Sequence, residues 1–187
     1  MSFVRPLRIT LYAILWIFSA VLLGLSAARL HYTLHLSPFD PLNQGTSFYD
    51  PIVAELVVTT LLTMIWAPFI VHNIVTKREY GHLYTFTSEL VGLFVLFIFW
   101  LVGAAIATSF WGNLHWCHQY MQCRLLTALV AFAWLGWILI FALFLTSLLH
   151  SFANSAFSDP MHGQLYPRES VVYPAGTQTS EYRTSRA

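Results

Sequence analysis

The residues of this chain best suited to chemistry are two cysteines with two histidines beside them, in the segment 111–124. Cys117 and Cys123 are the only cysteines among 187 residues. If this segment faces an oxidising compartment, two thiols so close in sequence are expected to form a disulfide that restrains the loop. The alternative is a metal site that adds His115 and His118, although their spacing matches no common zinc pattern. We predict the disulfide.

A second group consists of charged residues expected near one edge of a membrane. Arg29, Glu55 and Arg124 lie at the ends of apolar runs, and an ionised side chain in lipid is costly unless it finds a partner. We therefore predict an ion-pair cluster in which Glu55 binds one or both arginines and ties three helices together. Thr59 and Thr63 follow Glu55 at helical spacing, so this face should point into the bundle. A structural clamp is favoured over the start of a proton or cation path.

Glu89 is the acidic residue expected at the opposite edge. It shares a helical stripe with Leu96, Trp100, Gly103 and Ala107, so it should face protein rather than lipid. A negative charge is also favourable at the N-terminus of a helix. We predict that Glu89 is a polar anchor on the inner side, with no catalytic role.

The remaining sequence contains no convincing catalytic or cofactor motif. The eight histidines are dispersed, and we find no nucleophile with its base, phosphate loop or paired carboxylates. The nine Lys and Arg residues are spread along the chain rather than clustered on a basic face, which argues against nucleic acid as a partner. We therefore expect a protein that is not an enzyme and that has no cofactor and no metal.

Four apolar runs carry these residues, and they indicate that lipid is the solvent. The runs cover 7–30, 52–75, 90–110 and 125–149, and each reaches the length of about 20 residues that a membrane-spanning helix needs. With 57% hydrophobic and 9% charged residues, a water-soluble globule could not cover its surface with polar groups. The first run exceeds the core of about 7–15 residues found in signal peptides, so it should be retained as a helix. The predicted fold is an all-α, integral-membrane four-helix bundle.

The charges outside the runs predict the topology and the domain organisation. Basic residues precede the first run, follow the second and occur after the fourth, at Arg5, Arg8, Lys77, Arg78, Arg168, Arg183 and Arg186. The positive-inside rule therefore places both termini in the cytosol. Residues 1–150 should form the four-span transmembrane domain. Residues 151–187, which are rich in Ser, Thr, Pro and Gly, should form a disordered cytosolic tail.

Small residues recur at helical spacing in two of the runs, where they could let helix backbones approach closely in lipid. They are Ala20, Gly24 and Ala28 in the first run and Gly103 and Ala107 in the third. We predict that they pack the helices of one chain together. A homo-oligomer is a further expectation, because the chain has more aromatic surface than one small bundle can bury.

Four stretches, in this order, carry a resemblance to a known family: GLSAARLHYT, FYDPIVAELVVTTLLTMIW, LVGAAIAT and CRLLTALVAFAWLGWI. Together they resemble the MARVEL-domain tetraspans, especially the small fungal members, over nearly the whole chain except the tail. The resemblance implies an M-shaped four-helix bundle with cytosolic termini. It also implies that Arg29 and Glu55 are polar anchors and that Cys117 and Cys123 form a loop disulfide.

Proteins of this family are associated with membrane apposition, lipid microdomains and vesicle trafficking. The resemblance therefore implies a membrane-organising role in the plasma membrane or in endomembranes and vesicles. The implied partners are membrane lipids, with sterols or sphingolipids among them, and other membrane proteins. The alternative function is a small channel or transporter with a pathway within or between bundles, which would need a continuous polar cavity.

Overall fold

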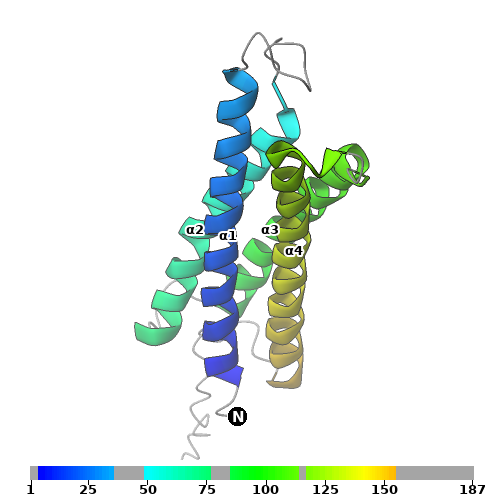
Figure 1. Ribbon diagram of the computed structural model, residues 1–187. Helices are drawn as coiled ribbons and strands as arrows, with labels where there is room; N and C mark the ends of the chain where they lie inside the picture. Colours follow the sequence, from blue (N-terminus) through cyan, green and yellow to red (C-terminus); the bar gives the residue numbers. More distant parts are fainter. Residues whose placement is uncertain (1–3, 36–48, 77–84, 114–116, 155–187) are drawn as a thin grey trace, which may run out of the picture.

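The computed structural model describes residues 4–35, 49–76, 85–113 and 117–154, and the regular structure in these ranges is helical. The helices are α1 (Val4–Leu34), α2 (Pro51–Thr76), α3 (Phe86–Trp111) and α4 (Met121–Asn154), shown in Figure 1. Each is long and apolar enough to cross a membrane, which confirms the predicted all-α fold with four spans. Helix α4 continues to Asn154, past the domain boundary expected at residue 150.

The helices form an antiparallel bundle in which each packs against its neighbour along the chain. Helix α4 closes the bundle by packing against α1, whereas α2 and α3 share the smallest interface among neighbouring helices. In Figure 1, α1 begins and α4 ends at the same end of the bundle. We call this the N-terminal end. The opposite end, which holds the segment between α3 and α4, is the disulfide end.

The buried side chains of the helices follow a seven-residue repeat. In α1 they are Arg8, Tyr12, Leu15, Ser19, Leu22, Ser26, Arg29 and Thr33. In α3 the same alternation of three and four residues joins Phe86, Glu89, Leu93, Leu96, Trp100, Gly103 and Ala107. This spacing is typical of helices that pack side by side at small crossing angles. It confirms the stripe predicted for the third run.

Two tryptophans occupy the space left by glycines on facing helices. The ring of Trp100 in α3 would lie 2.0 Å from a Cβ atom added at Gly136 in α4. The ring of Trp66 in α2 would lie 2.1 Å from one added at Gly92 in α3. Trp100 is fully buried, and its Nε1 donates a hydrogen bond of 2.9 Å to Thr63 Oγ1. This indole therefore fills the middle of the bundle with its polar group satisfied.

The two predicted stripes of small residues have different outcomes. Gly103 and Ala107 are buried in α3, and a Cβ atom added at Gly103 would lie within 3 Å of two α2 side chains. Gly24 and Ala28 are exposed, Ala20 is only partly buried, and no atom lies within 4 Å of a Cβ added at Gly24. The α1 stripe therefore does not pack helices within this chain. Helix α1 uses its seven-residue repeat for that purpose instead.

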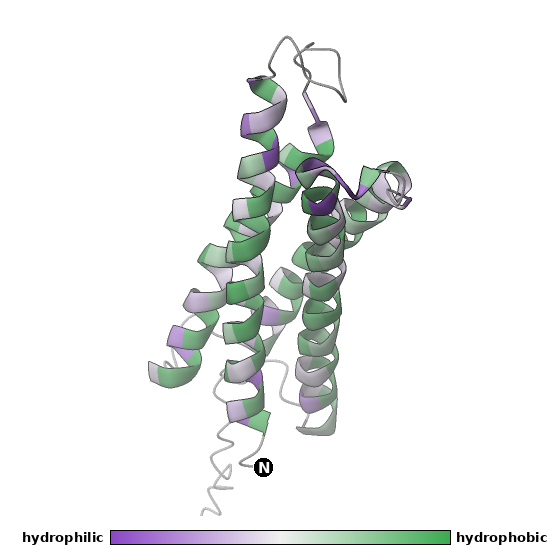
Figure 2. Ribbon diagram, in the orientation of Figure 1, coloured by the Kyte–Doolittle hydropathy of each residue, from purple (hydrophilic) through white to green (hydrophobic). Residues whose placement is uncertain are grey.

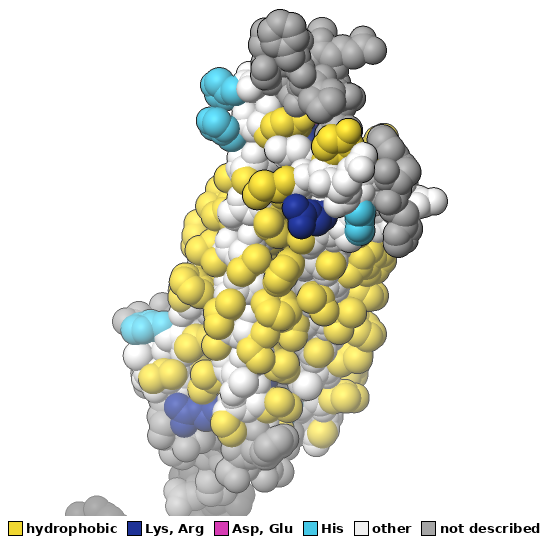
Figure 3. Space-filling model, viewed as in Figure 1, with side chains coloured by type: hydrophobic (Ala, Val, Ile, Leu, Met, Phe, Trp, Pro, Cys, Tyr) yellow, Lys and Arg dark blue, Asp and Glu magenta, His cyan; other side chains and the backbone are white. Residues whose placement is uncertain are grey.

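The outward faces of the helices carry large apolar side chains. Ile65, Val91 and Phe110, for example, are 71%, 59% and 70% exposed. In Figure 3 apolar side chains cover the middle of the visible face, with arginine side chains toward its two ends, and in Figure 2 the hydrophilic positions likewise concentrate toward the helix ends. Such a surface is unfavourable in water and suited to the hydrocarbon of a bilayer.

Candidate functional site

Glu89 is the centre of a buried polar cluster at the N-terminal end of the bundle. It is fully buried in the first turn of α3, and its Oε2 forms an ion pair with Arg8 Nη2 of α1. Its Oε1 accepts hydrogen bonds from Tyr12 Oη at 2.7 Å and from Ser147 Oγ of α4 at 3.2 Å. Both carboxylate oxygens are thus engaged by neighbouring helices. This arrangement clamps α1, α3 and α4 together and does not present the carboxylate to a substrate.

The local sequence explains how the clamp is assembled. Thr85 caps α3, its side chain accepting a hydrogen bond of 3.4 Å from a backbone N–H of the first turn, and this places Glu89 where a negative charge is favourable. Arg8 and Tyr12 lie one turn apart on α1, so both reach the same carboxylate. The guanidinium carbon of Arg8 also lies 4.8 Å from the centre of the Phe86 ring, a cation–π contact.

Two further contacts at the N-terminal end join α1 to α2 and α3 to α4. Arg5 Nη2 donates a hydrogen bond of 3.0 Å to the carbonyl oxygen of Ile74 in the last turn of α2. The ring of His150 in α4 lies 5.2 Å from that of Phe86.

The orientation predicted for Glu89, toward protein, is confirmed, but its partners were not predicted. The spacing of Arg8 and Tyr12, four residues apart on the buried stripe of α1, was the available signal.

The ion-pair cluster predicted at the other end is not formed. Arg29 Nη2 binds Asp50 Oδ2 at 3.1 Å, and its Nε lies 3.2 Å from the same oxygen. Arg124 is exposed in the first turn of α4 and takes part in neither ion pair found in the described ranges. Asp50 directly precedes α2, so it lies nearer the membrane edge and meets the end of α1. Asp50 was not among the residues predicted for this cluster.

Glu55 is turned toward α3 instead of toward an arginine. Its Oε1 accepts a hydrogen bond of 2.7 Å from Thr59 Oγ1. Its Oε2 is buried and has no hydrogen-bond partner in the described part of the chain. That oxygen would lie 2.6 Å from a Cβ atom added at Gly103, so the glycine makes room for the carboxyl group. Thr59 and Thr63 are fully buried, which confirms that this face of α2 points into the bundle.

A groove lies between the start of α2 and the end of α3, where Glu55 is one of its lining residues. Its volume is about 510 Å³, and its lining is mostly apolar. The lining residues are Asp50, Pro51, Ile52 and Glu55 from the α2 side and Val102, Ile106, Phe110 and Trp111 from α3. Because α2 and α3 share the smallest interface among neighbouring helices, they leave this space between them.

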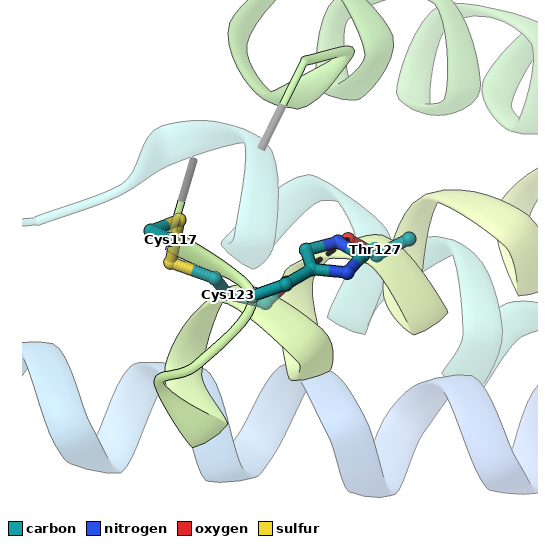
Figure 4. Close-up of a disulfide and its surroundings, with 4 residues drawn as sticks. Cys117, Cys123 and Thr127 are labelled. Atoms are coloured by element: carbon teal, nitrogen blue, oxygen red, sulfur yellow. Dashed lines mark hydrogen bonds between the residues drawn. A yellow bond between two sulfur atoms is a disulfide. The ribbon is translucent and has the colours of Figure 1, made fainter. Parts of the chain in front are cut away.

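The predicted disulfide joins Cys117 to Cys123 at the end of the bundle opposite the start of α1. The two Cα atoms are 5.9 Å apart, and both side chains are buried (Figure 4). Nearby, a ring nitrogen of His118 lies 3.2 Å from Thr127 Oγ1 in α4. Because the two sulfur atoms are bonded to each other, they are not available as thiolate ligands for the alternative metal site. His115, the fourth residue of that alternative, lies outside the described residues.

We expect Cys117 and Cys123 to resist alkylation until the protein is reduced. Denatured protein treated with a maleimide should gain no label before reduction and two labels afterwards, because disulfide sulfurs are not nucleophiles. Intact-protein mass spectrometry measures both numbers. The Cys117→Ser variant is the control, since its remaining thiol should react without reductant. Two labels on the unreduced protein, isolated under non-reducing conditions, would contradict the disulfide.

Comparisons of the chain with protein-family models, with curated proteins and with solved structures found no match. Several basic positions used to predict topology, namely Lys77, Arg78, Arg168, Arg183 and Arg186, lie outside the described residues. The described residues thus form a buried polar clamp around Glu89, a peripheral ion pair between Arg29 and Asp50, and a groove lined by the unsatisfied carboxyl group of Glu55.

Proposed function

We propose that this protein is a non-enzymatic, membrane-organising tetraspan that acts through its lipid-facing surface and through contacts with neighbouring membrane proteins. The observation that carries the proposal is the closed centre of the bundle. Trp100 is fully buried there, its ring lies against Gly136, and its indole N–H is bound to Thr63. A filled centre beneath a wide apolar surface favours a role in arranging lipid and protein over one in moving solutes.

The distribution of polar groups supports the same function. The Glu89 clamp lies at the N-terminal end and the pair Arg29–Asp50 at the disulfide end, while Trp100 lies between them. Each ionised group of these pairs is bound by another side chain of the bundle. A conduction path through a single bundle would instead need accessible polar groups through its full depth.

The proposal includes a topology and a location. Both termini face the cytosol, so the disulfide end faces a lumen or the cell exterior, where a disulfide is stable. The protein resides in the plasma membrane or in endomembranes and vesicles, and its role is like that of the MARVEL-domain tetraspans, the family whose resemblance the sequence analysis describes. Its partners are membrane lipids, including sterols or sphingolipids, and other membrane proteins.

Reconstitution into giant vesicles with coexisting lipid phases tests this function. We expect labelled protein to concentrate in one lipid phase. It should also slow the diffusion of labelled lipids around it, since a rigid apolar surface orders the lipid chains in contact with it. Solute and ion flux through proteoliposomes should equal that of protein-free vesicles. Fluorescence imaging, photobleaching recovery and entrapped ion indicators provide these three measurements.

The same reconstitution identifies the alternative function. Selective flux that changes in the Glu55→Gln variant would support a channel or transporter with a pathway between bundles, beside the α2–α3 groove. A uniform distribution of the protein, with no effect on lipid diffusion, would contradict the organising role. Unchanged flux in Glu55→Gln is the expected result, because the organising role provides no solute pathway that the charge of Glu55 could influence.

A further inference from the structure

The groove between α2 and α3 has the size and position of a site for one lipid chain. Its volume of about 510 Å³ lies within the range of about 300–1,000 Å³ typical of small-molecule pockets. It is formed where α2 begins and α3 ends, so it opens at the disulfide end of the bundle. An amphiphile in the bilayer could therefore enter it with its head group at the membrane edge.

The charges of the groove are complementary to a cation. Among the described residues, two carboxyl groups line it, those of Asp50 and Glu55, and no basic side chain does. Asp50 is neutralised by Arg29, whereas Glu55 receives only the hydroxyl of Thr59. The second oxygen of Glu55 is buried and receives no hydrogen bond from the part of the chain that the structure describes. An ionised carboxylate is strongly disfavoured in a low-dielectric environment without a counter-charge, so a cation that enters this groove would be paired by Glu55.

The remaining lining residues divide the groove into a head-group end and a chain end. Trp111 and Phe110, in the last turn of α3, lie beside the start of α2, and aromatic faces attract ammonium groups. Ile106 and Val102 lie one and two turns deeper and offer only hydrocarbon. A phosphate head group does not fit this arrangement, because it would meet the carboxyl groups of Asp50 and Glu55. Arg29 could not compensate for this repulsion, since it is already paired with Asp50.

We propose that this groove binds a single-chain lipid amine, such as a long-chain amino alcohol, with its ammonium group on Glu55. In the bound state the Glu55 carboxylate turns from Gly103 into the groove, and the hydrocarbon chain follows Ile106 and Val102. Thr59 holds the other carboxylate oxygen. This binding site goes beyond the proposed function and does not depend on it.

Photocrosslinking on the full-length protein in phosphatidylcholine nanodiscs tests the site. The probe is octadecylamine carrying a photoreactive diazirine in its chain, and the crosslinked peptide is identified by mass spectrometry. We expect label in the α3 peptide that contains Ile106 and Trp111. Octadecylamine should compete with the probe, whereas octadecanol and stearate of the same chain length should not, because only the amine supplies the missing positive charge.

Three variants separate specific binding from general lipid contact. Glu55→Gln keeps the shape of the side chain and removes its charge, so half-maximal labelling should require about tenfold more probe. Ile106→Trp fills the groove and should abolish labelling of this peptide. Ile98→Trp is the matched control: Ile98 and Ile106 are exposed to similar extents, 43% and 40%, but Ile98 does not line the groove. It should label like the wild-type protein.

Some results would overturn the proposal. Equal competition by amine, alcohol and carboxylate would show an apolar contact that does not select a head group. Unchanged labelling in both Glu55→Gln and Ile106→Trp would place the lipid elsewhere. Labelling is measured on isolated nanodiscs, so a failed phase-distribution experiment leaves this result unaffected, and a failed labelling experiment leaves the organising role unaffected.

Discussion

Glu89→Leu should lower the free energy of unfolding by about 3–5 kcal/mol, the largest loss expected of any single replacement in this bundle. The variant leaves the guanidinium of Arg8, which is only 2% exposed, without its counter-charge. It also removes the acceptor for the hydroxyl groups of Tyr12 and Ser147. Reversible unfolding in mixed detergent micelles, followed by tryptophan fluorescence and circular dichroism, measures the loss.

The double variant Arg8→Met/Glu89→Leu is the control for this prediction. Replacing a whole buried ion pair by apolar residues of similar size is commonly close to neutral, so the double variant should regain more than half of the stability lost. The single variant Arg8→Met completes this double-mutant cycle and leaves the carboxylate of Glu89 without the charge of Arg8. If the two single losses simply add in the double variant, the residues are not energetically coupled and the clamp is contradicted.

Gly136→Ala should destabilise the bundle by about 1–3 kcal/mol through overpacking. The added Cβ atom would lie 2.0 Å from the ring of Trp100, a distance that requires movement. The indole cannot yield easily, because it is rigid, fully buried and held by its hydrogen bond to Thr63. Helices α3 and α4 must therefore separate. The same unfolding assay detects the loss, and a changed tryptophan emission spectrum should accompany it.

Gly24→Ala is the matched control, since it makes the same chemical change on the outward face of α1. Nothing lies within 4 Å of the added methyl group, so no clash is expected. Alanine also favours the helix over glycine by up to about 1 kcal/mol. The control should therefore be neutral or slightly stabilising. Equal effects of the two replacements would contradict the close packing of Trp100 on α4.

The fold class follows directly from the sequence because membrane-spanning helices are recognised by length and composition. Four apolar runs predicted four helices, and the structure extends each run by only a few residues at its ends. The disulfide was also predictable, since Cys117 and Cys123 are separated by only six positions. Proximity along the chain, together with location at a loop, was enough to bring the two thiols together.

The pairing of charges depended on the tertiary structure. Arg8 and Glu89 are 81 positions apart, and each could have met several residues at the same depth of the membrane. Arg29 had both Asp50 and Glu55 within reach along the bundle axis, and the structure pairs it with Asp50. Sequence pattern indicates the depth of a residue along its helix, but not which of the neighbouring helices it faces.

The rotation of each helix about its axis was likewise decided by packing. These helices are apolar around most of their circumference, so periodicity hardly distinguishes the side that faces protein from the side that faces lipid. The small residues at Gly24 and Ala28 therefore looked suited to an interface and lie on the outside of α1. Length, composition and the spacing of the cysteines were enough to predict the four spans and the disulfide. Only the contacts between helices decided which face of each is buried, where Glu55 points and where a groove remains.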